Sequence, residues 1–206
     1  MLEKSTSTLI SFVAAATAGF LFIGFVTFAI LQDRSAVLVY LRDPAAHFKF
    51  SPFAGLVSNS GILTTIATAA VCLFAAAHGK TETTLLRAIG LFSLVLGLDD
   101  LLMLHEDTLP NRLGLPETLA YVCYVLAALY IAIRFRLPLR RAPLSGLILA
   151  MGLLAASFAV DALTAFGNVQ TVVEDGLKFV GLVVWSAYWI NRAGQDLRHQ
   201  AAMSKG

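Results

Sequence analysis

Long apolar runs separated by short polar segments make up most of this chain. Six runs of 17 to 23 residues are each close to the roughly 20 apolar residues that an α-helix needs to cross a bilayer. All six prolines fall between the runs, as expected for unbroken helices. The pattern predicts an all-α, polytopic membrane protein whose six transmembrane helices form one domain over residues 1–206. The predicted spans are residues 9–31, 56–77, 85–105, 117–133, 144–166 and 169–190.

The composition supports a membrane location. Hydrophobic residues make up 58% of the 206 residues and charged residues 14%, whereas soluble domains have about 45–50% apolar and about 25% charged residues. The formal net charge is only +2. We therefore expect membrane lipids around the spans and no nucleic-acid partner.

The basic residues are distributed unequally between the two sides of the predicted bundle. Ten lysine and arginine residues fall in the N-terminus, the second–third and fourth–fifth connections and the tail, whereas four fall on the opposite side. Lysine and arginine accumulate on the cytoplasmic side of membrane proteins. We therefore predict a multi-pass protein of the cytoplasmic (inner) cell membrane with both termini in the cytoplasm.

The acidic residues gather on the other, outer side. With a helical rise of about 1.5 Å per residue, Asp99, Asp161 and Glu174 would lie at similar depths, roughly 6–10 Å below the outer surface. Carboxylates from three spans at one depth in one leaflet predict a shared acidic pocket. Eight of the thirteen acidic residues lie in or beside the outer half of the last four spans, namely Asp99, Asp100, Glu106, Asp107, Glu117, Asp161, Glu174 and Asp175.

The segment 98–107 contains four carboxylates and one histidine in ten residues. A charge near the middle of a bilayer costs roughly 2.5–3.5 kcal/mol on insertion scales. A charged helix end in water accounts for Glu106, but the apolar run continues after Asp99 and Asp100. Carboxylates that share a dry site must hold protons, pair with a base or bind a cation. We predict that Asp99, Asp100, His105 and Glu106 are metal ligands.

The fifth and sixth spans add charged residues of both signs. Asp161 is isolated among apolar residues, and Glu174 precedes Lys178 by four positions, the favourable order for a helical ion pair. Lys178 is also an alternative partner for Asp161. Because ionisable residues inside a membrane indicate functional sites, Asp161, Glu174 and Lys178 are the predicted catalytic residues.

The predicted cofactor is a divalent metal ion of unspecified identity. Carboxylates together with one or two imidazoles suit Mn, Fe, Zn, Mg or Ca. The paired ExxH motifs of di-iron bundles and the HExxH zinc motif are absent from the sequence. The metal hypothesis therefore depends only on the expected convergence of these side chains.

Three functions are compatible with this pattern. The first is cation binding in an outward-facing acidic pocket, in an enzyme that acts on a lipid or a small substrate. The second is a proton- or cation-coupled carrier or channel component, with Asp99, Asp161 and Glu174 as a relay. The third is a non-catalytic subunit whose charges bind a membrane-protein partner or a second copy of the chain. The sequence leaves open whether the protein is an enzyme.

Four arginines lie close together between the fourth and fifth spans, at positions 134, 136, 140 and 141. The simplest interpretation is a topology anchor on the cytoplasmic side. The alternative is a binding site for anionic lipid headgroups.

Overall fold

A computed structural model of the chain describes residues 2–32, 41–79, 81–161 and 168–203. These residues are helical with short connections and contain no strand, so the predicted all-α fold is confirmed for them. The chain divides into two compact parts, Met1–Ala54 and Gly55–Gly206. The prediction of a single domain stays a prediction.

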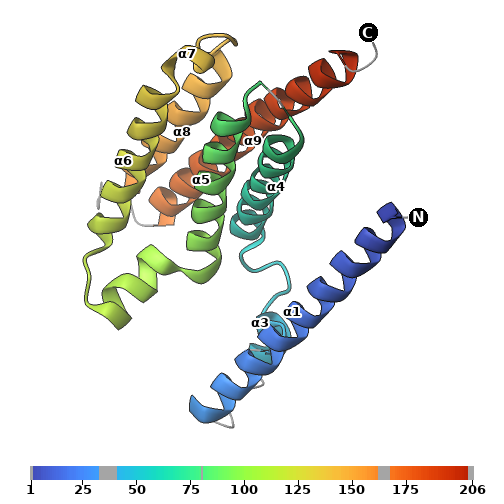
Figure 1. The fold of residues 1–206 in the computed structure, drawn as a ribbon. Helices are drawn as coiled ribbons and strands as arrows, with labels where there is room; N and C mark the ends of the chain where they lie inside the picture. The colour runs from blue at the N-terminus through green and yellow to red at the C-terminus, as the bar shows by residue number, and fades with distance from the viewer. Residues whose placement is uncertain (1, 33–40, 80, 162–167, 204–206) are drawn as a thin grey trace. The chain divides into compact units, whose positions relative to one another are not determined.

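The described residues of the first part form one long helix and one short one (Figure 1). From residue 13 onward the long helix is exposed almost throughout, and Phe20 is 77% exposed. Asp43 caps the short helix by accepting a hydrogen bond from the backbone N–H of Ala46 at 3.1 Å, which satisfies one of the free N–H groups of the first turn. The two helices are α1 (Leu2–Gln32) and α3 (Pro44–Phe48).

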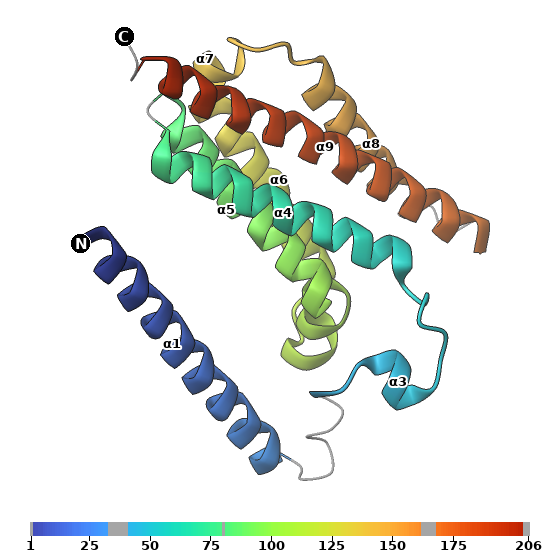
Figure 2. The same cartoon turned by 90° about the vertical axis from the view of Figure 1, so that its right-hand side faces the viewer.

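The second part is a bundle in which α4 packs against both α5 and α9, while α8 packs along α9 (Figures 1 and 2). A π-helix, η1, follows α5 and contacts α6. The bounds are α4 (Leu56–His78), α5 (Thr83–Leu102), η1 (Leu104–Arg112), α6 (Glu117–Arg134), α7 (Arg136–Leu139), α8 (Ser145–Asp161) and α9 (Asn168–Met203).

The core of the bundle lies between α4, α5 and α9. Trp185 and Trp189 of α9 are buried with Leu86 and Ile89 of α5. The Trp185 indole N–H donates to Ser93 Oγ at 3.0 Å. Burial removes both indole rings from solvent or lipid, and the interhelical hydrogen bond satisfies the N–H donor of Trp185.

Small residues allow α4 and α5 to approach closely. A Cβ added at Gly90 would lie 2.7 Å from Leu73 Cγ, and one added at Gly97 would lie 2.7 Å from Ile66 Cδ1. Close backbone approach through small residues is typical of helices that pack in membranes. The site described below lies at the end of α5 that carries Gly97.

In the part of the chain that the structure describes, three helices, not six, are long and apolar enough to cross a membrane. In the predicted third span, α5 carries Arg87, Asp99 and Asp100 within 20 residues. In the predicted fifth span, α8 is apolar but has 17 described residues, and the end of that span and the following turn lie outside the described residues. In the predicted sixth span, α9 continues to residue 203 through a charged segment. The three candidate spans are Val13–Leu31, Leu56–His78 and Glu117–Arg134.

Candidate metal-binding site

A sharp backbone reversal at the end of α5 builds the site. Met103 adopts the left-handed conformation, with φ 48° and ψ 45°, and ends the helix. The backbone N–H of Thr108 then donates to Met103 O at 3.1 Å, which is the five-residue spacing of a π-helix. This turn directs η1 back toward the end of α5, so that His105 returns to Asp99.

Asp99 and His105 form a buried pair. Asp99 is 2% exposed and His105 is 6% exposed. Asp99 Oδ1 accepts the backbone N–H of His105 at 3.2 Å, and Oδ2 accepts a hydrogen bond from His105 Nδ1. Because a carboxylate can only accept, the proton is on Nδ1, and the neutral ring has its free lone pair on Nε2. Asp99 therefore fixes both the orientation and the tautomer of His105.

Asp100 is paired with a lysine from another helix. Lys178 Nζ of α9 lies 2.8 Å from Asp100 Oδ1 of α5. The sequence predicts Glu174 as the ion-pair partner of Lys178, whereas the salt bridge in the structure is with Asp100. Tertiary packing explains the difference, because it brings a carboxylate from α5 to the ammonium group of α9.

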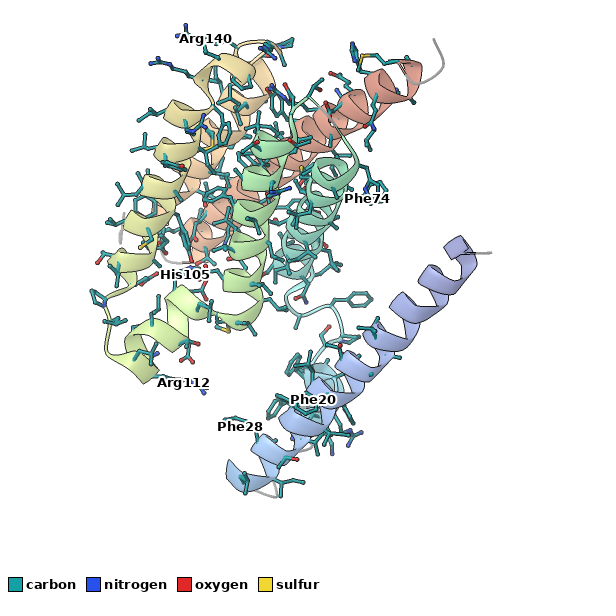
Figure 3. The ribbon with its side chains drawn as sticks, in the orientation of Figure 1. Phe20, Phe28, Phe74, His105, Arg112 and Arg140 are labelled. Atoms are coloured by element: carbon teal, nitrogen blue, oxygen red, sulfur yellow. The ribbon has the colours of Figure 1, made fainter. Side chains whose placement is uncertain are left out.

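Three of the four predicted metal ligands come together. One donor atom from each of Asp99, Asp100 and His105 can be chosen so that all three lie within 4.8 Å of one another. Glu106 lies at the edge of this group: its side chain is 53% exposed, and Oε1 is 3.5 Å from His105 Nε2. Glu106 therefore lies beside the ring nitrogen of His105 that does not contact Asp99. Figure 3 shows His105 at this end of the bundle.

Tyrosines of α6 form one side of the site. The ring of Tyr121 lies 5.4 Å from the ring of His105, and its hydroxyl donates to Glu117 Oε1 at 2.7 Å. The hydroxyl of Tyr124 interacts with the Asp99 carboxylate. The sequence pattern groups Glu117 with the outer acidic residues, whereas Tyr121 and Tyr124 are not among the predicted site residues. The positions of these three residues at i, i+4 and i+7 place them on one helix face, which is the signal that would have found them.

Two predicted catalytic residues lie outside the ligand group. Asp161 is exposed at the described end of α8, where its backbone carbonyl accepts a hydrogen bond from Gln170 Nε2 at 3.1 Å. Glu174 is half-buried on α9, and its backbone carbonyl accepts from Ser157 Oγ at 3.0 Å. The two carboxylates interact electrostatically with each other. They add negative charge near the site without joining the ligand group.

The charges of the site do not balance. The carboxylates of Asp99, Asp100 and Glu106 are opposed by the ammonium group of Lys178, which leaves a net charge of −2 with His105 neutral and −1 with His105 protonated. Carboxylates held close together in a dry environment repel one another. The arrangement is therefore suited to accept a further cation.

The fold and the site together define an all-helical protein with apolar helices of membrane-spanning length and a buried carboxylate–imidazole group. The chain belongs to the family described as "Domain of unknown function (DUF8692)", whose model matches residues 9–191. No curated protein and no solved structure matches the chain. The function is therefore inferred from the residues of the site.

Proposed function

We propose that this protein is a multi-pass membrane protein that binds a divalent metal ion beside Asp99, Asp100, His105 and Glu106. The observation that carries the proposal is the group of two carboxylates and one imidazole, with donor atoms within 4.8 Å of one another. Their net negative charge gives a divalent cation a favourable electrostatic environment.

The donor set fits a first-row metal better than calcium. Imidazole nitrogen together with carboxylate oxygen suits Mn²⁺, Fe²⁺ or Zn²⁺, whereas Ca²⁺ takes oxygen ligands alone. A histidine that binds a metal usually donates its other ring N–H to a carboxylate, as His105 donates to Asp99. Asp99 would then orient the imidazole, and the ion would bind at His105 Nε2 beside Glu106, whose Oε1 lies 3.5 Å away.

A metal ion in this position would supply a Lewis acid and a bound water of lowered pKa. The residues around it can hold and move protons. Lys178 neutralises Asp100, and Glu174 and Asp161 lie further out as additional carboxylates. This set of groups supports a metal-dependent hydrolytic enzyme acting on a lipid or a small substrate.

We propose that the protein crosses the inner (cytoplasmic) membrane six times. Both termini would then lie in the cytoplasm. Three of the six proposed spans contain helices that are candidates by length and composition. The helices α5 and α9 pack against α4, and Asp100 of α5 is paired with Lys178 of α9, as ionisable side chains within a membrane require. The metal site would then lie near the outer surface.

A second candidate function is favoured by the salt bridge between Lys178 and Asp100. This lysine supplies an internal positive charge, so Asp100 has a partner without a metal ion. Asp99 and His105 would then hold a proton between them, and the relay of Asp99, Asp161 and Glu174 would couple proton movement to transport.

Metal content tests the first proposal. The wild-type chain, purified in detergent and washed with metal-free buffer, is expected to retain close to one equivalent of Mn, Fe or Zn by elemental analysis. Glu106→Gln and His105→Gln are expected to lose most of this metal while keeping the wild-type circular dichroism spectrum. Asp107→Asn is the matched control, because Asp107 is a neighbouring acid paired with Arg112 at 3.4 Å.

Two results would overturn the metal proposal. One is washed wild-type protein without bound metal whose melting temperature does not change when Mn²⁺, Fe²⁺ or Zn²⁺ is added. The other is equal metal content in His105→Gln, Glu106→Gln and the Asp107→Asn control. Proton flux into liposomes that Asp161→Asn abolishes would instead support the relay.

A further inference from the structure

We propose that the corner between α6 and α7 binds the phosphate headgroup of an anionic membrane phospholipid. An open hollow of about 450 Å³ lies at this corner, which is within the size range of small-ligand sites. We call it the arginine hollow. It is lined by Ile133, Arg134, Arg136, Leu137 and Pro138.

Two buried side chains determine which residues face outward at this corner. Phe135 and Leu139 are 6% and 8% exposed and belong to the core of the bundle. They are four residues apart, so they share one face of the helical turn. The intervening residues Arg136 and Leu137, and the preceding Arg134, are therefore exposed.

The corner is held in place by a buried arginine of α9. Arg192 Nη2 donates to the backbone carbonyl of Pro138 at 2.5 Å, and its Nε donates to Glu82 Oε2 at 2.6 Å. The α7 backbone is thus fastened to both α9 and the residue that precedes α5. A site whose backbone is fixed in advance loses less conformational freedom when a ligand binds.

The arginines at this corner are available for a ligand. Arg134, Arg136, Arg140 and Arg141 are exposed, and none forms a salt bridge with a carboxylate among the described residues. The Arg134 guanidinium lies 5.4 Å from the centroid of the Phe135 ring. Guanidinium groups bind phosphate through two parallel hydrogen bonds, so this surface is complementary to an anionic headgroup.

The apolar part of the hollow favours a lipid over a free anion. Ile133 and Leu137 are each 68% exposed beside the arginines, and such side chains suit contact with acyl chains. Arg134 is the last residue of α6, a candidate membrane span, so the hollow would lie at the level of the headgroups. Figure 3 shows Arg140 at the end of the bundle opposite His105. The inference requires a membrane-embedded α6 but not the proposed metal site.

The test uses the full chain in nanodiscs that contain phosphatidylcholine with increasing phosphatidylglycerol. Phosphatidylglycerol is expected to raise the melting temperature of the wild type, and native mass spectrometry should detect retained phosphatidylglycerol. Arg134→Gln/Arg136→Gln should need at least about tenfold more phosphatidylglycerol for the same shift, because it removes both guanidinium groups of the hollow. The charge-matched control is Arg87→Gln/Arg198→Gln, which changes two exposed arginines elsewhere in the bundle and should respond like the wild type.

A second pair of substitutions separates a defined site from diffuse surface charge. Arg140→Gln/Arg141→Gln changes two exposed arginines that do not line the hollow, and it should reduce the response much less than Arg134→Gln/Arg136→Gln. Equal losses in the two variants would overturn the proposal of a defined site. A wild type that does not distinguish phosphatidylglycerol from phosphatidylcholine would also overturn it. Stabilisation in detergent by inorganic phosphate alone, without retained lipid, would identify a free anion instead and overturn the lipid assignment.

Discussion

Lys178 Nζ of α9 lies 2.8 Å from Asp100 Oδ1 of α5, although the two residues are 78 positions apart. This contact fastens the first turns of α9 to the end of α5. It also places a fixed positive charge beside the group that we propose to bind a metal ion. The two proposed functions therefore predict different roles for the same lysine.

Substituting Lys178 tests its role beside the proposed metal site. Lys178→Gln is expected to destabilise the metal-free protein by about 1–3 kcal/mol, because Asp100 loses its partner in a partly buried position. Under the metal proposal, affinity for Mn²⁺ or Zn²⁺ should rise roughly tenfold, since one competing positive charge is removed. Calorimetric titration and thermal unfolding in detergent measure the two effects.

The control for this substitution is Arg198→Gln, which removes a positive charge from an exposed position further along the same helix. It should change neither the metal affinity nor the melting temperature by a measurable amount. A metal affinity that falls in Lys178→Gln would show that the lysine supports the bound state and does not compete with the ion.

The lengths of the apolar runs predicted most of the helices but not their exact ends. The predicted third span continues to residue 105, whereas α5 ends at Leu102 because Met103 adopts a positive φ. A left-handed conformation is uncommon for a residue other than glycine, so no local sequence signal announces it. The predicted sixth span stops at residue 190, whereas α9 continues to Met203, because a helix can continue into a polar segment.

The site could also be predicted only in part, because some of its contacts depend on tertiary structure that the local sequence does not specify. Asp99 and Asp100 stand out because charges in an apolar run are expensive. The contact between Asp99 and His105 depends on the reversal at Met103, and the contact between Asp100 and Lys178 depends on packing between helices. Sequence spacing describes neighbours on one helix well, which is why it suggested Glu174 as the partner of Lys178.

The hydrogen bond between Trp185 and Ser93 should contribute measurably to stability. Ser93→Ala is expected to lower the free energy of unfolding by about 1–3 kcal/mol, because the buried indole N–H would lose its partner. Thermal unfolding in detergent and a shift in tryptophan emission would report the change. Ser58→Ala, at an exposed position in the first turn of α4, is the control and should leave both signals unchanged. Equal melting temperatures for the two variants would contradict the prediction.

Arg192 and Glu82 form a buried ion pair at the end of the bundle opposite the proposed metal site. Arg192 is 5% exposed and contacts both oxygens of Glu82, at 2.6 and 2.7 Å. Burial lowers the pKa of Arg192, but the hydrogen bonds and charge of Glu82 more than offset this effect and leave the pKa raised. A group whose pKa is higher in the folded state than in the unfolded state stabilises the protein fully when the pH is below its pKa in the unfolded state. This stabilisation is lost only when the pH rises through its pKa in the folded state. The contribution of Arg192 should therefore be constant between about pH 6 and pH 9.

A double-mutant cycle tests this pair. Arg192→Met is expected to destabilise the protein by about 3–5 kcal/mol, because it leaves the Glu82 carboxylate without its partner. Arg192→Met/Glu82→Met should recover a substantial part of the loss, since removing both charges avoids an unpaired one. Chemical unfolding in mixed micelles gives the four free energies. If the loss of unfolding free energy in the double variant equals the sum of the two single losses, Arg192 and Glu82 are not coupled.

The close approach of α4 and α5 at Gly90 leads to a prediction with an internal control. Gly90→Ala and Gly152→Ala both replace a helical glycine, a change that alone favours the helix by about 0.8–1.0 kcal/mol. At Gly90 the new Cβ would lie 2.7 Å from Leu73 Cγ and 3.2 Å from Ala69 O, whereas at Gly152 nothing lies within 4 Å. Overpacking of this kind costs about 1–3 kcal/mol.

The two alanine substitutions should therefore have different effects on the melting temperature. Gly152→Ala should raise the melting temperature slightly or leave it unchanged, and Gly90→Ala should lower it, because Leu73 can move away only by giving up contacts in the α4–α5 interface. Gly97→Ala should fall between them, since its nearest neighbour is the flexible end of the Ile66 side chain, at 2.7 Å. The order Gly152, Gly97, Gly90 in differential scanning fluorimetry would show that backbone proximity along α5 controls the stability of the helix pair that positions Asp99 and Asp100. The reverse order would mean that α4 and α5 are further apart than described, and the geometry of the proposed site would have to be revised with them.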